Sequence, residues 1–136
     1  EGWGLYAEQL ADEIGAYENN PFGQIGYLQS LMFRAARLVV DTGIHAKGWS
    51  REQAIAYFKD NAPKTEQDIV NEIDRYIDNP GQALAYKIGE LKIRELRARA
   101  EKELGDKFDL RAFHRRALDI GGVGLDTLKG AVLRGR

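Results

Sequence analysis

The stretch Glu1–Glu8 (EGWGLYAE) begins the sequence and predicts the helix around which the rest of the chain is organised. The pattern predicts a helix from about Gly2 to Tyr17. Glu1 and Glu8 share one stripe of that helix, about 10 Å apart along its axis, because successive helical residues turn by about 100°. The opposite stripe is apolar and consists of Trp3, Tyr6, Leu10, Ile14 and Tyr17. One face is therefore suited to a core, and the other is acidic.

The acidic stripe has two interpretations. Gly4, Asp12 and Gly15 lie close to it, and glycine allows another backbone to approach. In the simpler interpretation these carboxylates are solvated, as most are. In the second interpretation, an acidic side chain on this stripe belongs to a buried functional site, for example as a metal ligand.

The rest of the sequence predicts further helices, separated by proline and glycine breaks. No stretch shows the alternation typical of a strand. The expected helices cover residues 22–40, 51–60, 65–78, 82–104, 110–120 and 125–133. The prediction is an all-α fold, an irregular array of six to seven helices, with residues 1–136 forming a single helical domain or subdomain.

The helix at 22–40 is apolar around most of its circumference, which predicts a central, buried helix. Arg34, Arg37 and Asp41 form a polar stripe on it, and buried charges need partners. An ion pair between Arg37 and Asp41, four residues apart, is the simplest expected partnership.

Composition excludes several classes of function. The chain has 136 residues, 43% of them hydrophobic, which is enough for a core. Its net charge of −1 gives no general attraction to nucleic acid. We expect no membrane span, no disulfide and no thiolate metal site, since there is no long apolar run and no cysteine. No signal peptide is recognisable, and the first residue is Glu, so the sequence is expected to be part of a longer protein.

Three side chains are candidates for chemistry. His45 is expected in a glycine-bounded loop at 41–49, where functional side chains are often found, although a structural role is the alternative. Tyr86 shares a helix face with Gln82 and could stabilise an oxyanion, or it could simply pack in the core. His114 lies among arginines and is expected to be structural or exposed. The sequence contains no GxSxG, P-loop, CxxC or HExxH motif, and so no complete catalytic constellation.

Four blocks of the sequence, in this order, resemble one known family. The blocks are Glu1–Leu10 (EGWGLYAEQL), Arg34–Trp49 (RAARLVVDTGIHAKGW), Arg75–Ile93 (RYIDNPGQALAYKIGELKI) and Phe108–Leu118 (FDLRAFHRRAL). Together they resemble the C-terminal part of the bacterial family named for domain of unknown function 885. Full-length members are several times longer and mostly helical, and they resemble gluzincin-type zinc metallopeptidases.

The resemblance implies roles for individual residues. A HExxPGH-like helix upstream of this chain would supply two histidine ligands and the general base, and Glu1 would be the third ligand to Zn²⁺. Glu8 becomes a supporting or alternative ligand. By analogy of role, His45 and Tyr86 become candidates for substrate binding or oxyanion stabilisation.

These implications define two functional hypotheses. In the first, the chain is the C-terminal portion of a zinc-dependent peptidase that acts on peptide substrates, and the chain alone is inactive and binds zinc poorly. In the second, it is a non-enzymatic helical scaffold or protein-interaction module. We also expect the chain alone to self-associate, through one of its first two helices, and any export signal to lie upstream.

Overall fold

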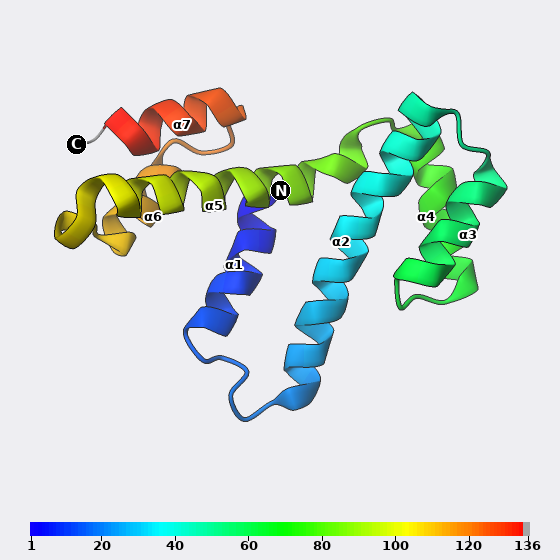
Figure 1. Ribbon diagram of the computed structural model, residues 1–136, viewed down its shortest axis with the longest axis horizontal. Coiled ribbons are helices and arrows are strands. Elements are labelled where there is room, and N and C mark those ends of the chain that lie inside the picture. Colours follow the sequence, from blue (N-terminus) through cyan, green and yellow to red (C-terminus); the bar gives the residue numbers. More distant parts are fainter. Residues whose placement is uncertain (135–136) are drawn as a thin grey trace.

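The computed structural model describes residues 1–134, and within that range every regular element is helical (Figure 1). The all-α prediction is confirmed. The α-helices are α1 (Gly2–Glu13), α2 (Pro21–Lys47), α3 (Arg51–Asn61), α4 (Glu66–Asp78), α5 (Ala85–Leu104), α6 (Leu110–Asp119) and α7 (Leu125–Arg134). Two short 3₁₀ turns, η1 (Gln82–Leu84) and η2 (Gly105–Lys107), flank α5. In the described part of the chain, no helix has the length and apolar content needed to cross a membrane.

The helices gather around two separate cores. In Figure 1, α3 and α4 lie against the upper part of α2, and α6 and α7 lie along the far half of α5. The first core joins α2, α3, α4 and η1 through Phe33, Ala36, Val40, Ala54, Phe58, Ala62, Ile69, Ile73, Tyr76 and Ala83. The second joins α1, α5, α6 and α7 through Tyr6, Ile93, Leu96, Ala100, Phe113, Ala117, Leu128 and Val132. No buried residue belongs to both clusters.

Helix α2 differs from its prediction in length. It runs through the loop expected at 41–49 and ends at Lys47, where Gly48 adopts a left-handed conformation with φ 67°. Gly43 lies inside the helix, and a Cβ there would come within 2.5 Å of the Trp49 ring. The glycine at 43 therefore serves the packing of Trp49 and does not end the helix.

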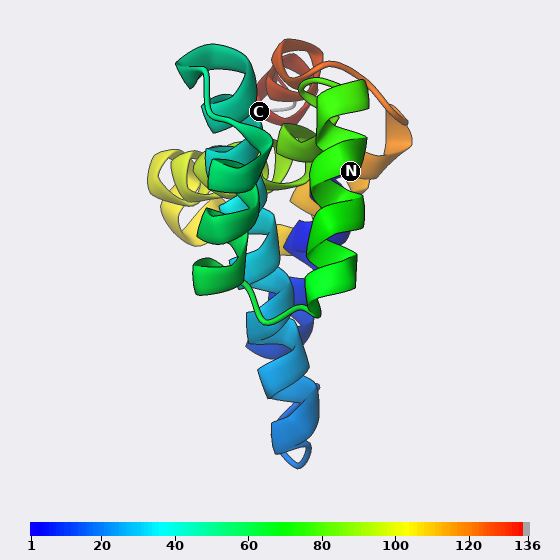
Figure 2. The same cartoon turned by 90° about the vertical axis from the view of Figure 1, so that its right-hand side faces the viewer.

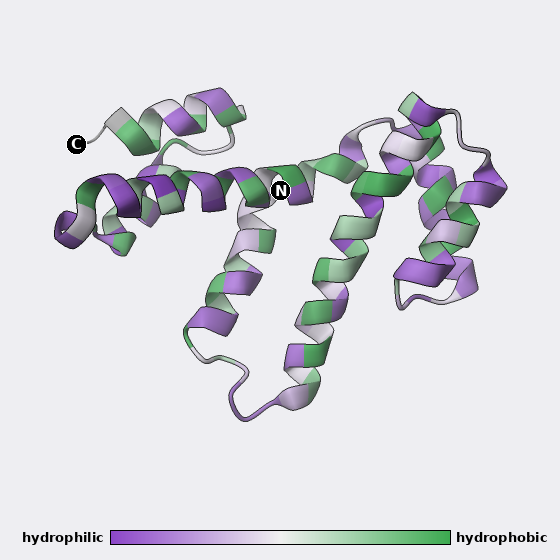
Figure 3. Cartoon of the chain, viewed as in Figure 1, coloured by the Kyte–Doolittle hydropathy of each residue, from purple (hydrophilic) through white to green (hydrophobic). Residues whose placement is uncertain are grey.

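The prediction of a central, buried helix holds only for the C-terminal half of α2. Apolar residues occur along all of α2 (Figure 3), but only its C-terminal half packs against α3 and α4. In the other half Phe22 is 85% exposed and Met32 is 51% exposed. Figure 2 shows this end of α2 projecting beyond the other helices. Periodicity identifies apolar faces, but it does not say which of them has a neighbour.

Helix α1 is shorter than predicted. It ends at Glu13, and Gly15 turns the chain with φ 79°. Ile14, expected on the core stripe, is 75% exposed, whereas Tyr6 is fully buried. Trp3 and Tyr6, at the start of that stripe, pack in the second core, whereas Ile14 and Tyr17, at its end, lie in the turn to α2. Tyr17 instead stacks on Tyr27, with ring centres 5.8 Å apart.

Three helices, α3, α4 and α6, begin where the sequence predicts. By residue type and spacing, the sequence predicts a capping box of Ser50 and Gln53 for α3 and N-caps at Thr65 for α4 and at Asp109 for α6. All three form, and Thr65 caps α4 through the Asp68 N–H. These caps satisfy free N–H groups within three residues of the cap, so they depend little on the rest of the fold.

Candidate functional site

The position of Glu1 depends on a close contact between two helices. Gly2 of α1 meets Gly89 of α5, and a Cβ on Gly2 would lie 2.4 Å from the Gly89 backbone. We expected glycine to permit such an approach at Gly4 or Gly15. Gly4, however, has nothing within 4 Å, and a Cβ on Gly15 would meet only the side chain of Glu18. The Gly2–Gly89 contact holds the start of α1, and with it Glu1, against the first turns of α5.

Tyr86 lies beside Glu1. Hydrogen bonding to the Glu1 carboxylate raises the pKa of the Tyr86 hydroxyl, and burial raises it further. The hydroxyl therefore stays protonated at neutral pH. The structure thus brings together two of the four candidate site residues (Glu1, Glu8, His45 and Tyr86), namely Glu1 at the start of α1 and Tyr86 at the start of α5.

Two arginines of α2 contact the Tyr86 ring. The guanidinium carbons of Arg34 and Arg37 lie 5.3 Å and 5.1 Å from the ring centre. Cation–π contacts of this length favour positive charge at the ring face. The group formed by Glu1, Arg34, Arg37 and Tyr86 is called the Tyr86 cluster below.

The expected ion pair between Arg37 and Asp41 does not form. Asp41 instead accepts a hydrogen bond from the Gly81 backbone N–H, at 3.1 Å, and Arg37 Nη2 donates to Gln82 Oε1, also at 3.1 Å. Both side chains thus hold the turn that leads into α5. The turn from residue 79 to 81 comes close enough to compete for these groups, and sequence spacing within α2 cannot show that.

Glu8 is engaged by α2. Its Oε2 accepts a hydrogen bond from Ser30 Oγ at 2.7 Å, and Ser30 Oγ in turn accepts one from Arg34 Nη1 at 3.1 Å. Glu8 therefore connects to the Tyr86 cluster through Ser30 and Arg34. The carboxylate of Glu1, by contrast, belongs to an exposed residue.

His45 lies away from its expected setting. It occupies the last turn of α2 rather than a loop, and its Nε2 lies 2.9 Å from the Tyr76 carbonyl oxygen, to which it donates as the Nε2–H tautomer. This bond joins the end of α2 to α4. The structure does not bring His45 into the Tyr86 cluster.

His114 has the structural setting that its sequence context predicts. Its ring packs against Trp3, Tyr6 and Phe113, and its Nε2 lies 2.8 Å from the Tyr6 hydroxyl. Burial lowers the pKa of His114, and the charge of Arg97 lowers it further. A neutral imidazole is favoured in this setting.

Sequence reasoning missed one buried charge close to this site. Glu90 is fully buried on α5 and pairs with Lys87 at 2.8 Å and Arg94 at 3.2 Å. The spacing of these residues, three and four positions apart, is a signal for a helical ion pair. The sequence does not show that the Glu90 side chain is buried.

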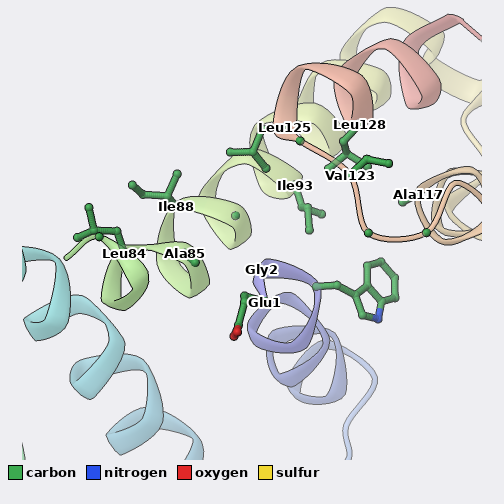
Figure 4. A pocket seen from close by; sticks show the side chains of 16 residues that line it. Glu1, Gly2, Leu84, Ala85, Ile88, Ile93, Ala117, Val123, Leu125 and Leu128 are labelled. Atoms are coloured by element: carbon green, nitrogen blue, oxygen red, sulfur yellow. The ribbon is translucent and has the colours of Figure 1, made fainter. Parts of the chain in front are cut away.

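An apolar pocket of about 500 Å³ opens next to Glu1 (Figure 4). It lies between the start of α1, the first turns of α5 and the segment that leads into α7. Its lining includes Trp3, Leu84, Ile88, Ile93, Val123, Leu125 and Leu128, and Glu1 is its only ionisable side chain. Figure 4 shows the Glu1 carboxylate pointing away from these apolar groups. Such a pocket suits an apolar side chain, with polar chemistry at its edge.

The residues present fit a metal site only in part. Among residues 1–134, no group of three His, Asp or Glu side chains is placed to hold a metal ion. Glu1 is exposed and at the edge of a pocket, as a contributing ligand would be, whereas Glu8 already accepts a hydrogen bond from Ser30.

Fold and site together describe an all-helical protein with an apolar pocket and an adjoining polar cluster. The chain belongs to the family described as "Bacterial protein of unknown function (DUF885)", which matches residues 1–132. Among solved structures it is similar to one described as "the putative lipoprotein from Colwellia psychrerythraea", with 54% identity and a TM-score of 0.96. The match covers 98% of this chain and 23% of that one, so this chain spans about a quarter of the length of its relative. No curated protein matches the chain.

Proposed function

We propose that this chain is the C-terminal portion of a zinc-dependent peptidase, in which Glu1 is the third protein ligand to the metal. The observation that carries the proposal is the Glu1 carboxylate beside the Tyr86 hydroxyl, at the edge of an apolar pocket. The two histidine ligands and the general base would come from the part of the protein outside this chain.

Each residue has a defined part in this proposal. Zinc, when bound, supplies a Lewis acid that activates water. Glu1 would hold the metal through its carboxylate. The Tyr86 hydroxyl is protonated at neutral pH and is hydrogen-bonded to Glu1 in this chain. With Glu1 on the metal, its one O–H would turn to donate a hydrogen bond to the oxygen on which charge develops. The pocket receives an apolar side chain of the peptide substrate.

The other two candidates have supporting parts. Glu8, bonded to Ser30, anchors α1 to α2 and keeps Arg34 in position. His45, bonded to the Tyr76 carbonyl, keeps the end of α2 against α4. A supporting role predicts that Glu8→Gln retains zinc at the level of the unaltered protein.

The test uses the intact protein and the substitution Glu1→Gln, which removes the charge and keeps the size. We expect loss of most bound zinc, measured by elemental analysis, and loss of peptide hydrolysis by at least about 100-fold. The control is Asp60→Asn, which removes an exposed carboxylate from the end of α3. Unchanged zinc content in Glu1→Gln would overturn the proposal.

A second function, a helical interaction module, is favoured by the exposed apolar side chains on the N-terminal half of α2. These are Phe22, Ile25, Leu28 and Met32. In this alternative the chain of 136 residues self-associates through that face. Sedimentation of the chain alone should give a dimer that Leu28→Lys dissociates, and a monomer at high concentration contradicts the alternative.

We also propose that the intact protein is exported to the bacterial envelope. The description of the Colwellia relative as a lipoprotein supports this. Fractionation of cells that express the intact protein should place it with the envelope, and recovery in the cytoplasm alone contradicts the proposal.

A further inference from the structure

Arg34 and Arg37 are two neighbouring positive charges that form no direct ion pair within residues 1–134, although the charge of Arg37 acts through space on Glu72. Both guanidinium groups lie over the rings of Phe33 and Tyr86, at 5.1 to 5.6 Å from the ring centres. Arg37 is only 3% exposed. A buried charge without a directly bonded counter-charge is costly, so proteins normally pair it.

Elsewhere in this structure, charges in comparable positions are paired. Arg97, which is largely buried, binds Glu13 at 2.7 Å and Glu101 at 2.9 Å. Buried Glu90 has two basic partners. In the described part of the chain, the absence of a direct ion pair at Arg34 and Arg37 therefore distinguishes the Tyr86 cluster from these pairs.

Both arginines have hydrogen-bonding capacity left over. Arg37 donates only to Gln82 and Arg34 only to Ser30, both neutral acceptors. The Nε of each is buried without a hydrogen-bond partner. A guanidinium carries five N–H donors in a planar fork that matches the two oxygens of a carboxylate. Two such forks, held by the same aromatic ring, are suited to one carboxylate.

We propose that Arg34 and Arg37 bind a carboxylate of the peptide substrate, namely its C-terminal carboxylate. This inference rests on the proposed peptidase function and adds a substrate class to it. One tyrosine ring separates the arginines from the Tyr86 hydroxyl, so the carboxylate lies within about two residues of the reacting carbonyl, at about 3.5 Å a residue. The substrates are then short peptides, or longer ones cleaved near their C-terminus.

The test compares peptides that carry a free C-terminal carboxylate with the same peptides amidated at that end. The intact protein should hydrolyse the free acids with a kcat/KM about 10- to 100-fold higher, because a hydrogen bond to a charged group is worth that factor. In Arg34→Gln the kcat/KM for the free acids should fall to that for the amides, so that the ratio of the two is about one. The matched control is Arg51→Gln, which removes an exposed arginine paired with Asp74 on α3 and α4.

A carboxylate from another part of the intact protein is the competing source. In that case Arg34→Gln lowers the melting temperature of the intact protein and leaves the acid-to-amide preference unchanged, which overturns the inference. Arg37→Lys, which keeps the buried charge, provides a second variant if Arg34→Gln does not fold. It should reduce the preference, since a lysine presents no fork.

A binding measurement separates this inference from the proposed function. Titration calorimetry of the intact Glu1→Gln protein, which the proposed function expects to be inactive, with trialanine and trialanine amide reports carboxylate recognition without turnover. Hydrolysis without any acid preference leaves the peptidase proposal standing and overturns the carboxylate site. No hydrolysis, together with tighter binding of trialanine that Arg34→Gln abolishes, overturns the peptidase proposal and supports the carboxylate site.

Discussion

Gly2 and Gly89 set the distance between α1 and α5, and through it the position of Glu1. At this crossing each backbone occupies the place where the other residue would carry a Cβ. Because backbone atoms cannot rotate aside as a side chain can, any larger residue must separate the helices. The candidate ligand thus depends on two residues that have no side chain.

Gly2→Ala and Gly89→Ala should each destabilise the chain by about 2–3 kcal/mol, the usual cost of overpacking. Urea unfolding followed by circular dichroism measures this. Gly4→Ala is the matched control, because nothing lies within 4 Å of its Cβ position. Alanine favours helix by up to about 1 kcal/mol over glycine, so this control should be neutral or stabilising. Equal effects at positions 2 and 4 would contradict the close contact.

Burial of His114 predicts a pH dependence of stability. Its pKa in the folded chain lies below the usual value of 6.5, so the unfolded chain takes up a proton first as the pH falls. Stability is therefore complete above about pH 6.5 and declines as the pH falls from there towards the lower folded pKa. Urea unfolding at intervals from pH 7.5 to 5 should show this decline in the unaltered chain, and His114→Gln should flatten it.

The carboxylates of Glu13 and Glu72 do not obscure that range. Their pKa values are lowered from a usual value of 4.5, since hydrogen bonds from Arg97 and from Tyr76 and Arg75 outweigh the effect of burial. Their contribution to stability is lost only at lower pH. A decline of the same size in His114→Gln would show that another group is responsible.

At the scale of elements, the beginnings of helices follow local rules and the end of α2 does not. Ser50, Thr65 and Asp109 begin α3, α4 and α6 where the sequence predicts. The end of α2 is displaced by seven residues from the expected 40 to Lys47. Packing of Trp49 on Gly43 and the bond from His45 to α4 stabilise the additional turns, and both are contacts that form only in the folded chain.

The capping box at α3 gives a prediction for one element. Ser50→Ala removes the acceptor for the Gln53 N–H and should cost about 1 kcal/mol in the free energy of unfolding. Gln53→Ala should cost less, and the double substitution should cost less than the sum, because the two bonds support each other. Denaturant unfolding of the three variants measures the coupling. Exact additivity would mean that the box does not act as a unit.

At the scale of the molecule, the two cores share no buried residue, and polar contacts connect them. Ser30 of α2 donates a hydrogen bond to Glu8 of α1, and the Arg34 guanidinium of α2 lies over the Tyr86 ring of α5. The two tryptophans report on one core each, Trp3 on the second and Trp49 beside the first. The two cores are therefore expected to differ in stability.

Phe58→Ala tests that separation, because Phe58 is fully buried in the first core. Removal of a buried phenylalanine costs about 3–5 kcal/mol. In a Trp3→Phe background, the fluorescence of Trp49 should report an early thermal transition. In a Trp49→Phe background, Trp3 should report a transition close to that of the chain with Phe58 intact. Coincident transitions would show that the chain unfolds as one unit.

The sequence by itself determined the all-helical class, the caps of three helices, the structural setting of His114 and the family. These depend on period, on residues a few positions apart and on blocks of matching sequence. Tertiary structure alone decided the partners of Arg37 and Asp41, the extent of α2, the place of His45 and the meeting of Glu1 with Tyr86. The physical reason is that the deciding contacts, apart from the packing of Trp49 on Gly43, join residues 31 to 85 positions apart in the sequence (Tyr76 with His45, Tyr86 with Glu1). A hydrogen bond between residues so far apart does not alter the hydrophobic pattern of either segment, so that pattern cannot predict it.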